Sequence, residues 1–438
     1  MGRKVAKFGG SSLADAGQFE KVRGILNKDA ERVLVVVSAP GKRFDKDEKV
    51  TDLLYSVHRL HAAGEDFGVA FDAVCERYLS IAKDLNLKVD IGAELVNIKQ
   101  NIQNGASKDY CASRGEYLNG LLMADYLGFE FIDPQSCIFF DEKGAFDADK
   151  TQEVLSVILK NVEKAVVPGF YGALKNGEVH TFSRGGSDIT GAIVARAAFA
   201  EAYENWTDVS GFMVADPRIV KEPLAIESIT YRELRELSYM GATVLHEDAV
   251  FPVHRAGIPT HIKNTNCPDA RGTVIKYTAK DDMPKHTITG IAGKRGFSII
   301  SIEKAMMNAE LGFGRRVLEA VEKEGISFEH LPTGIDTMCV VVQREALEGK
   351  QDKVVSNIMQ MCNPDTVTIH NDLAIIATVG RGMVHNYGTA ARVFSAMSNA
   401  GVNIRMIDQG SSEISIIVGV DDADFKKTIR AIYTEFVK

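Results

Sequence analysis

Apolar and polar positions along the chain follow two alternating patterns. Short β-branched runs, of which 32–37 is the clearest, predict buried parallel strands. Between these runs, apolar residues recur every three to four positions, which predicts amphipathic helices such as 52–61 and 91–103. Strands that alternate with helices predict a layered α/β sheet. We expect this α/β domain to cover residues 1–277 and a polar linker to cover 278–286.

After the linker the chain repeats itself. Arg316–Ala320 matches Arg392–Ala396, and the glycines and strand-like runs that follow align without a gap. The order of elements in the copies predicts ferredoxin-like βαββαβ units. The second copy lacks one strand, and an unused strand precedes the first copy, so we expect the first unit to be inserted in the second. The predicted bounds are 297–370 for the first unit, and 287–296 with 371–438 for the second.

Two Gly-Gly turns carry the candidate chemistry. One strand runs into the turn of Val5–Ser12, and another runs into Ser183–Thr190, which a helix follows. Glycines allow close backbone approach, and the amides and dipole of a helix start attract anions. Lys7 in the first turn can neutralise phosphate, while Arg184 beside Asp188 can grip a carboxylate or a phosphate. Two such turns facing each other would hold a nucleoside triphosphate; the alternative is a pair of ordinary tight turns with surface charges.

Composition narrows the classes of protein that fit. With 438 residues, 45% hydrophobic and 25% charged, the chain is expected to form roughly three domains with sizeable cores. A net charge of −8 without a basic run argues against a nucleic-acid partner. No apolar run has the length of a signal core or a membrane span. The six cysteines are scattered without a C-x-x-C pair, so we expect reduced thiols, no metal site and a cytoplasmic location.

The motifs together resemble those of a known family. Lys7–Ser12, Ser183–Asp188 and Thr207–Val209 look like the three signature loops of aspartokinases, which belong to the amino-acid kinase superfamily. The C-terminal repeat resembles their tandem ACT domains, and the resemblance covers essentially the whole chain. It implies an amino-acid-kinase-like α/β/α domain followed by two ACT units. Because the chain ends after the second unit, the monofunctional form without a fused homoserine dehydrogenase is expected.

The resemblance implies a reaction as well as a fold. An enzyme of this family phosphorylates the β-carboxylate of L-aspartate with ATP and Mg²⁺, giving 4-phospho-L-aspartate for lysine, threonine and methionine biosynthesis, without a tightly bound cofactor. A carboxylate is already ionised at pH 7, so catalysis needs positioning and charge neutralisation rather than a general base. The alternatives are a sibling kinase for glutamate, acetylglutamate or carbamate, and a non-catalytic amino-acid sensor. The presence of Lys7, Arg184 and Asp188 together argues for an enzyme.

Site residues carry over from the family one by one. Lys7 is expected on the transferring phosphate, Asp188 beside Lys7 or a magnesium-bound water, and Arg184 on the α-carboxylate of aspartate. The substrate site implied by the resemblance comprises Ser38, Thr51, Glu116 and Arg184. The implied nucleotide site comprises Lys7, Gly9, Gly10, Ser11, Gly185, Gly186, Ser187, Thr207, Asp208, Asp216 and Arg218. Thr243 stands where the family often has a lysine near the nucleotide, so no basic contact is assigned there.

The ACT pair is expected to bind a feedback inhibitor and to form a homodimer or a dimer of dimers. The effector turn is predicted at 307–314, facing 328–336. Glu329 and Asp336 supply two carboxylates there, which suit an effector with two ammonium groups and favour lysine over threonine; the alternative is that they are solvated charges. The predicted effector residues are Met307, Glu310, Phe313, Gly314, Phe328, Glu329 and Asp336.

Overall fold

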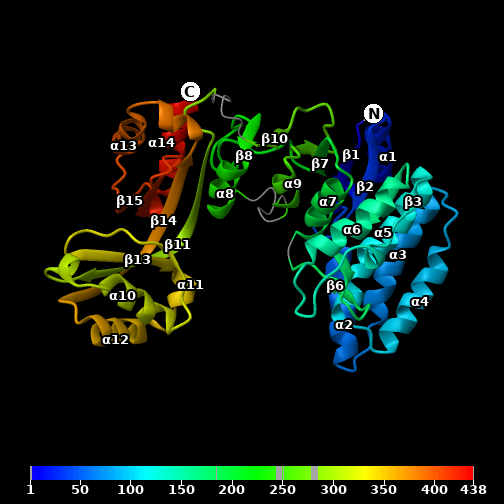
Figure 1. The fold of residues 1–438 in the computed structure, drawn as a ribbon, viewed down its shortest axis with the longest axis horizontal. Helices are drawn as coiled ribbons and strands as arrows, with labels where there is room; N and C mark the ends of the chain where they lie inside the picture. The colour runs from blue at the N-terminus through cyan, green and yellow to red at the C-terminus, as the bar shows by residue number, and fades with distance from the viewer. Residues whose placement is uncertain (1, 184, 243–248, 250, 278–284, 438) are drawn as a thin grey trace. The chain divides into compact units, whose positions relative to one another are not determined.

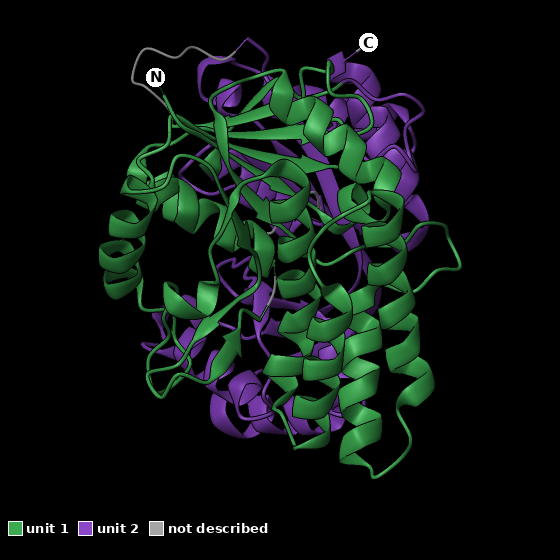
Figure 2. Ribbon diagram, turned by 90° about the vertical axis from the view of Figure 1, so that its right-hand side faces the viewer, with its two compact units in different colours: residues 1–212, 225–231, 243–279 green, residues 213–224, 232–242, 280–438 purple. Residues whose placement is uncertain are grey.

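The computed structural model describes residues 2–183, 185–242, 249, 251–277 and 285–437. The chain divides into two compact units, coloured separately in Figure 2. The first consists of residues 1–212, 225–231 and 243–279, and the second of 213–224, 232–242 and 280–438. Two segments that precede the predicted linker therefore pack in the second unit. In the part of the chain that is described, no helix is long and apolar enough to cross a membrane.

An eight-stranded sheet forms the centre of the first unit (Figure 1). Its order is β3-β4-β2-β1-β7-β9-β10-β8, and all neighbouring strands are parallel except β9 and β10. Most of it is therefore a sheet of the kind predicted from alternating strands and helices. The strands are β1 (Lys4–Phe8), β2 (Arg32–Val37), β3 (Glu130–Phe131), β4 (Ala165–Pro168), β7 (Ala202–Thr207), β8 (Ser228–Thr230), β9 (Thr260–Asn264) and β10 (Thr273–Lys276).

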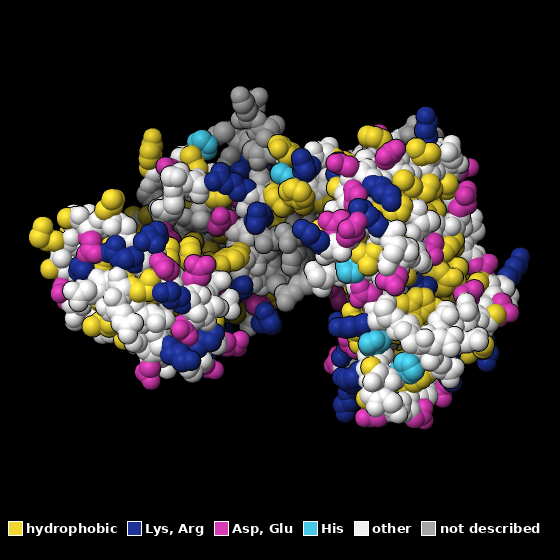
Figure 3. Space-filling model, turned by 60° about the horizontal axis from the view of Figure 1, so that its bottom comes forward, with side chains coloured by type: hydrophobic (Ala, Val, Ile, Leu, Met, Phe, Trp, Pro, Cys, Tyr) yellow, Lys and Arg dark blue, Asp and Glu magenta, His cyan; other side chains and the backbone are white. Residues whose placement is uncertain are grey.

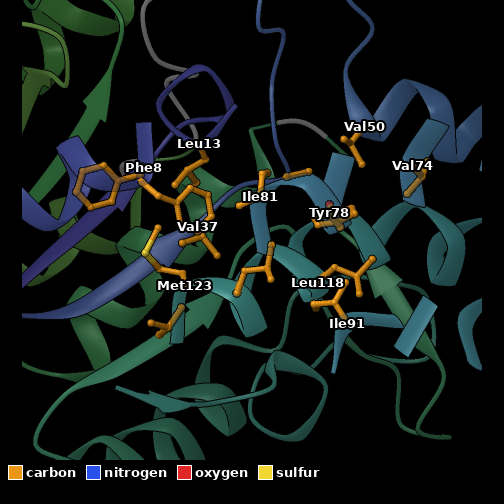
Figure 4. Close-up of a cluster of buried hydrophobic side chains, with 14 of the residues drawn as sticks. Phe8, Leu13, Val37, Val50, Val74, Tyr78, Ile81, Ile91, Leu118 and Met123 are labelled. Carbon is orange, nitrogen blue, oxygen red and sulfur yellow. The ribbon is translucent and has the colours of Figure 1, made fainter. Parts of the chain in front are cut away.

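Helices cover both faces of this sheet because its buried side chains alternate between them. Ala6 and Phe8 of β1 join one core with Val35 and Val37 of β2 and the apolar stripes of α1 to α5, part of which Figure 4 shows. The side chain of Lys7 points to the opposite face of the sheet, where it contacts α7. The helices of this unit are α1 (Ala16–Asn27), α2 (Val50–Ala62), α3 (Gly68–Asp84), α4 (Ile91–Gln103), α5 (Lys108–Leu127), α6 (Ala148–Lys160), α7 (Gly186–Ala197) and α9 (Phe251–Ala256). A separate hairpin, β5 (Tyr171–Ala173) with β6 (Val179–Thr181), leads into α7.

Two predictions of local structure were wrong in this unit. The helix after the second Gly-Gly turn begins at Gly186 rather than at residue 191, because Gly185 adopts a left-handed φ of 57° and starts the helix there. The second concerns residues 204–208, whose acidic and polar side chains, close to a second acidic cluster at Ala215–Arg218, predict a turn-rich loop over a nucleotide. Most of these residues belong instead to β7. Glu204 is buried in that strand because the Arg32 guanidinium and the Trp206 indole N–H both donate to its carboxylate.

A six-stranded sheet, in the order β12-β13-β11-β14-β16-β15, forms the second unit. Its strands are β11 (Gly290–Glu303), β12 (Phe328–His330), β13 (Thr337–Gln343), β14 (Thr366–Val379), β15 (Met406–Asp408) and β16 (Ser415–Asp421). The helices are α10 (Phe313–Glu322), α11 (Arg344–Leu347), α12 (Gln351–Cys362), α13 (Thr389–Asn399), α14 (Phe425–Val437) and all but the first residue of α8 (Tyr231–Tyr239).

The two long strands, β11 and β14, pass through both halves of this sheet. Residues 290–294 of β11 pair with 375–379 of β14, and residues 297–303 pair with 366–373. The later half of β11 also pairs with β13, and the later half of β14 with β16. Each half has its own apolar core. The core beside β16 also takes in residues of the segment 213–224, namely Ala215, Ile219 and Val220.

Candidate active site

The carboxyl ends of three parallel strands meet at one edge of the first sheet. Lys7 of β1 lies in register with Val36 of β2 and Asn205 of β7. Just beyond the strand ends, the Gly9 amide donates to the Trp206 carbonyl at 2.9 Å, and the Ser38 amide donates to the Phe8 carbonyl at 3.2 Å. The ends of β1, β2 and β7, which come from three distant stretches of sequence, are thus hydrogen-bonded neighbours. Ligands of parallel sheets bind at this edge.

A buried lysine lies at the centre of the edge. Lys7 is 6% exposed, and its ammonium forms an ion pair with the Asp188 carboxylate from the first turn of α7. Asn205 Nδ2 donates to the same carboxylate at 2.8 Å, and the Tyr203 hydroxyl donates to the Asp188 carbonyl at 3.0 Å. Asp188 is therefore fixed by groups from β7 and in turn fixes the lysine. A buried ammonium whose orientation is fixed by its neighbours is suited to bind a strongly negative ligand.

The glycines of the first turn allow its backbone to pass close to the next loop. The Gly41 amide donates to the Gly10 carbonyl at 2.8 Å. A Cβ on Gly10 would lie 2.9 Å from the Ala39 carbonyl oxygen, and a Cβ on Gly41 would lie 2.6 Å from the Gly10 carbonyl carbon. Only glycine fits at either position without moving backbone. In the second turn, a Cβ on Gly186 would meet Phe170 at 2.6 Å, so that glycine also serves close packing.

Glu116 of α5 is a buried carboxyl group near this lysine. The residue is 5% exposed, and Oε2 has no hydrogen-bond partner among the described residues. Burial raises the pKa of Glu116 to about 8, although hydrogen bonding to the Ala39 backbone and the charges of Lys7 and Arg114 lower it. A buried carboxylate with an unpaired oxygen costs free energy. The missing partner is of the kind that a ligand ammonium would supply.

The two other described substrate residues lie at the end of β2 and in the first turn of α2. Ser38 directly follows β2, and its carbonyl accepts a hydrogen bond from Asn119 Nδ2 at 2.6 Å. Thr51 lies half-buried in the first turn of α2. The sequence predicts a helix over 52–61 with Thr51 in the preceding loop. The helix instead begins at Val50, one residue before Thr51. The remaining substrate residue of the prediction, Arg184, lies outside the described residues.

The predicted nucleotide residues fall in both units. Thr207 ends β7, and its hydroxyl lies 3.2 Å from the carboxylate of Asp208, which is exposed. Ser11 belongs to a short 3₁₀ helix after β1, and Ser187 to the first turn of α7. Asp216 and Arg218 belong to the second unit, where they pair at 2.7 Å, and hydrogen bonds from Arg218 lower the pKa of the Asp216 carboxyl.

Two acidic side chains of the predicted effector site, Asp336 and Glu310, are paired with neighbouring groups. The Asp336 carboxylate accepts the Met306 amide at 2.8 Å, and Glu310 forms ion pairs with Lys304, at 2.8 Å, and with Arg316. The Lys304 ammonium lowers the pKa of Glu310.

Glu329 of β12 accepts hydrogen bonds from the Tyr239 hydroxyl and from Gln343 Nε2. Met307 and Phe313 are buried in the core of this half, Gly314 lies in the first turn of α10 beside Met338, and Phe328 is 48% exposed.

Two asparagines that sequence reasoning missed support the site. Asn205 orients Asp188, and Asn119 of α5 holds the Ser38 carbonyl. Both are at most 3% exposed. A polar pair inside an apolar strand, as in Glu204–Asn205, was the available signal for the first. Asn119 lies within a helix that is buried nearly all round, so its sequence context gives no comparable signal.

Comparison with known proteins places these features in a family. Residues 2–264 match the amino acid kinase family, and residues 376–436 match an ACT domain. Aspartokinase 3 of Bacillus subtilis is 40% identical over 99% of this chain and 98% of its own.

Three solved structures, of two proteins, are matched over the whole chain. The aspartate kinase of Clostridium acetobutylicum, described as an allosteric enzyme, superposes with a TM-score of 0.92 at 52% identity over all of both chains. Aspartokinase III of E. coli superposes at 0.76 in complex with aspartate and ADP, and at 0.75 in complex with lysine and aspartate. Its identity, 23% and 24% over all of both chains, supports the fold alone.

Proposed function

Because this chain belongs to the aspartokinases of the amino acid kinase family, we propose that the Lys7–Asp188 pair and Glu116 form the active site in which it phosphorylates L-aspartate with ATP. The observation that carries the assignment is the buried Lys7 ammonium at the strand ends near a buried Glu116 carboxyl group with an unpaired oxygen. The Lys7 ammonium can neutralise the phosphoryl group that is transferred, and the Glu116 carboxylate can bind the ammonium group of an amino acid.

The chemistry follows from these two groups. Glu116 binds the ammonium of aspartate and Arg184 its α-carboxylate, while Ser38 and Thr51 complete the substrate site. An oxygen of the β-carboxylate then attacks the γ-phosphorus, and the bond between that phosphorus and the leaving oxygen of ADP breaks. Lys7 neutralises the charge that develops on the phosphoryl oxygens, and Asp188 with Asn205 keeps its ammonium aimed there. No proton has to be removed from the substrate.

ATP is held from the two Gly-Gly turns. Amides of Gly10, Ser11, Gly185, Gly186 and Ser187 surround its phosphates, and the helix start at Gly186 favours their charge. Gly9, whose amide donates to the Trp206 carbonyl, contributes close backbone approach to the nucleotide instead. Thr207 and Asp208 contact the nucleotide from the end of β7, and Asp216 and Arg218 are the further nucleotide residues. Mg²⁺ enters bound to ATP.

The second unit carries the regulatory site in this proposal. Lysine binds at the turn 307–314 with Glu329 and Asp336 as partners of its two ammonium groups, and threonine is the alternative effector. The kinase domain spans 1–277, the first ACT domain 297–370, and the second 287–296 with 371–438. The strand pairing of β11 and β14 supports the insertion of one ACT domain in the other. The proposal includes a homodimer or dimer of dimers through the ACT domains and a cytoplasmic location.

Trapping of the product with hydroxylamine tests the proposed reaction. Incubation with ATP, Mg²⁺ and aspartate should give the β-hydroxamate and one ADP for each hydroxamate formed. Glutamate, acetylglutamate and carbamate should give none. Turnover of one of these acceptors in place of aspartate would assign the chain to a sibling kinase, and absence of turnover with all of them would point to a non-catalytic sensor.

A further inference from the structure

A charged loop joins β2 to α2 and contacts the first Gly-Gly turn. Eight consecutive residues of this loop, 42–49, carry seven charged side chains and the 61% exposed Phe44. At its start, the Gly41 amide holds the Gly10 carbonyl at 2.8 Å. The backbone of Gly41 is therefore coupled to the Gly10 carbonyl by a hydrogen bond.

A single buried guanidinium also binds this loop. Arg77 of α3 is 3% exposed, and it donates from Nη1 to the Gly41 carbonyl at 2.7 Å. Its Nη2 donates to the Asp47 carboxylate at 2.6 Å, so the two ends of the loop share one anchor. Asp47 also accepts the amide and guanidinium of Arg43. Arg77 Nε has no partner among the described residues, although it is buried.

Burial of a charged guanidinium costs free energy unless its N–H groups find acceptors. Desolvation lowers the pKa of Arg77, yet an arginine stays charged in proteins. The planar fork meets two acceptors of different kinds, a backbone carbonyl and a carboxylate, which the ammonium of a lysine cannot reproduce in the same geometry. Gly41 is thus held at its carbonyl by the Arg77 guanidinium and at its amide by the Gly10 carbonyl.

We propose that Arg77 is a positioning residue of the active site, which fixes the Gly10 peptide through Gly41 and so sets the geometry of the first phosphate turn. The inference rests on the proposed function, because Gly10 is there a phosphate-binding residue. Ser38 and Thr51 flank the same loop, so the anchor also bears on the aspartate side. Misplacement of a reacting group by about 1 Å costs roughly 10²-fold in rate.

Kinetics of matched variants of the full chain test this role. Arg77→Lys should lower kcat by about tenfold or more. Arg43→Lys is the control, because Arg43 binds the same Asp47 carboxylate but has no hydrogen bond to Gly41 in the structure; its kcat should stay within about twofold of wild type. Equal losses in the two variants would overturn the proposal, since anchoring of Asp47 alone would then suffice. So would a folded Arg77→Lys protein with wild-type kcat and KM values.

A second variant perturbs the same contact without touching the arginine. Gly41→Ala places a methyl group against the backbone of Gly10 and should reproduce the loss of kcat. Gly24→Ala is its control, because nothing lies within 4 Å of a Cβ there. The double variant Arg77→Lys/Gly41→Ala should lose little more than the worse single variant. If Arg77→Lys fails to fold, a normal kcat in Gly41→Ala overturns the proposal by itself.

Hydrogen–deuterium exchange separates this inference from the proposed reaction. Peptides covering residues 5–13 should exchange faster in Arg77→Lys than in wild type or Arg43→Lys. Faster exchange confined to 42–50 would show that Arg77 supports the charged loop only. This readout does not require turnover, so an inactive wild type would refute the proposed function while the exchange result still decides on Arg77.

Discussion

The pKa of Glu116 predicts a strong pH dependence of aspartate affinity. The pKa is about 8 in the ligand-free protein because the carboxyl group is buried. At pH 7 about a tenth of the molecules therefore carry the carboxylate that an ammonium needs, and at pH 6 about a hundredth. If only the ionised form binds aspartate, the apparent affinity falls by that fraction. The KM for aspartate should rise by about tenfold to fiftyfold from pH 8 to pH 6.

Steady-state kinetics at saturating ATP would measure this dependence between pH 6 and pH 8. Calorimetry in buffers of different ionisation enthalpy should show that aspartate binding at pH 7 releases close to one proton. A KM that is flat over this range, or binding without proton release, would refute the pairing of Glu116 with the substrate ammonium. Glu116→Gln should bind aspartate weakly at every pH and lose the dependence.

The same pKa predicts an effect on stability that needs no substrate. The folded pKa is raised above the ordinary value of 4.5, so between pH 4.5 and 8 the folded state keeps a proton that the unfolded state has lost. Stability from this group therefore decreases as pH rises through that window, by about 1.4 kcal/mol per pH unit. In ligand-free protein, Glu116→Gln should gain stability relative to wild type from pH 5 to pH 8. A constant difference between the two melting curves would contradict the pKa.

Three further substitutions probe the other parts of the site. Lys7→Ala should lower kcat by roughly 10²-fold or more and leave aspartate KM nearly unchanged, and a change in KM alone would remove Lys7 from phosphoryl transfer. Asp336→Ala should raise the lysine concentration for half inhibition by about tenfold without changing uninhibited activity; unchanged lysine sensitivity would refute the effector site. Asn205→Ala removes the Nδ2 donor that orients the Asp188 carboxylate, so kcat should fall by about tenfold, and an unchanged kcat would show that this hydrogen bond does not position the Lys7 ion pair.

Much of the fold could be predicted because its signals are local. β2 and α4 occupy the predicted residues. A β-branched run indicates a buried strand, and an uninterrupted apolar stripe indicates an amphipathic helix. β7 was missed because three of its six residues are polar. Its burial depends on Arg32, which is distant in sequence and pairs with Glu204. No window of sequence around β7 contains that partner.

Some residues of the candidate site could likewise be predicted from the sequence, and others could not. Gly-Gly turns and the charged residues next to them are visible in sequence, so the pairing of Lys7 with Asp188 was within reach. Arg77 and Asn119 gave no signal, because each acts on a backbone carbonyl of a distant loop. The unpaired oxygen of Glu116 is likewise a property of packing. Such residues become recognisable only when burial and hydrogen bonding are known.

In the proposed reaction, the β-carboxylate of aspartate is the phosphoryl acceptor at the Lys7 centre. Isotope transfer from aspartate labelled with ¹⁸O in its β-carboxylate tests this step, with the product cleaved by hydroxylamine at the carbonyl carbon. The phosphate released should carry a single ¹⁸O atom, visible as a shift of its ³¹P resonance, whereas aspartate labelled in the α-carboxylate should give unlabelled phosphate. Unlabelled phosphate from the β-labelled substrate would mean that water or another group had accepted the phosphoryl group, and would refute phosphorylation of the β-carboxylate.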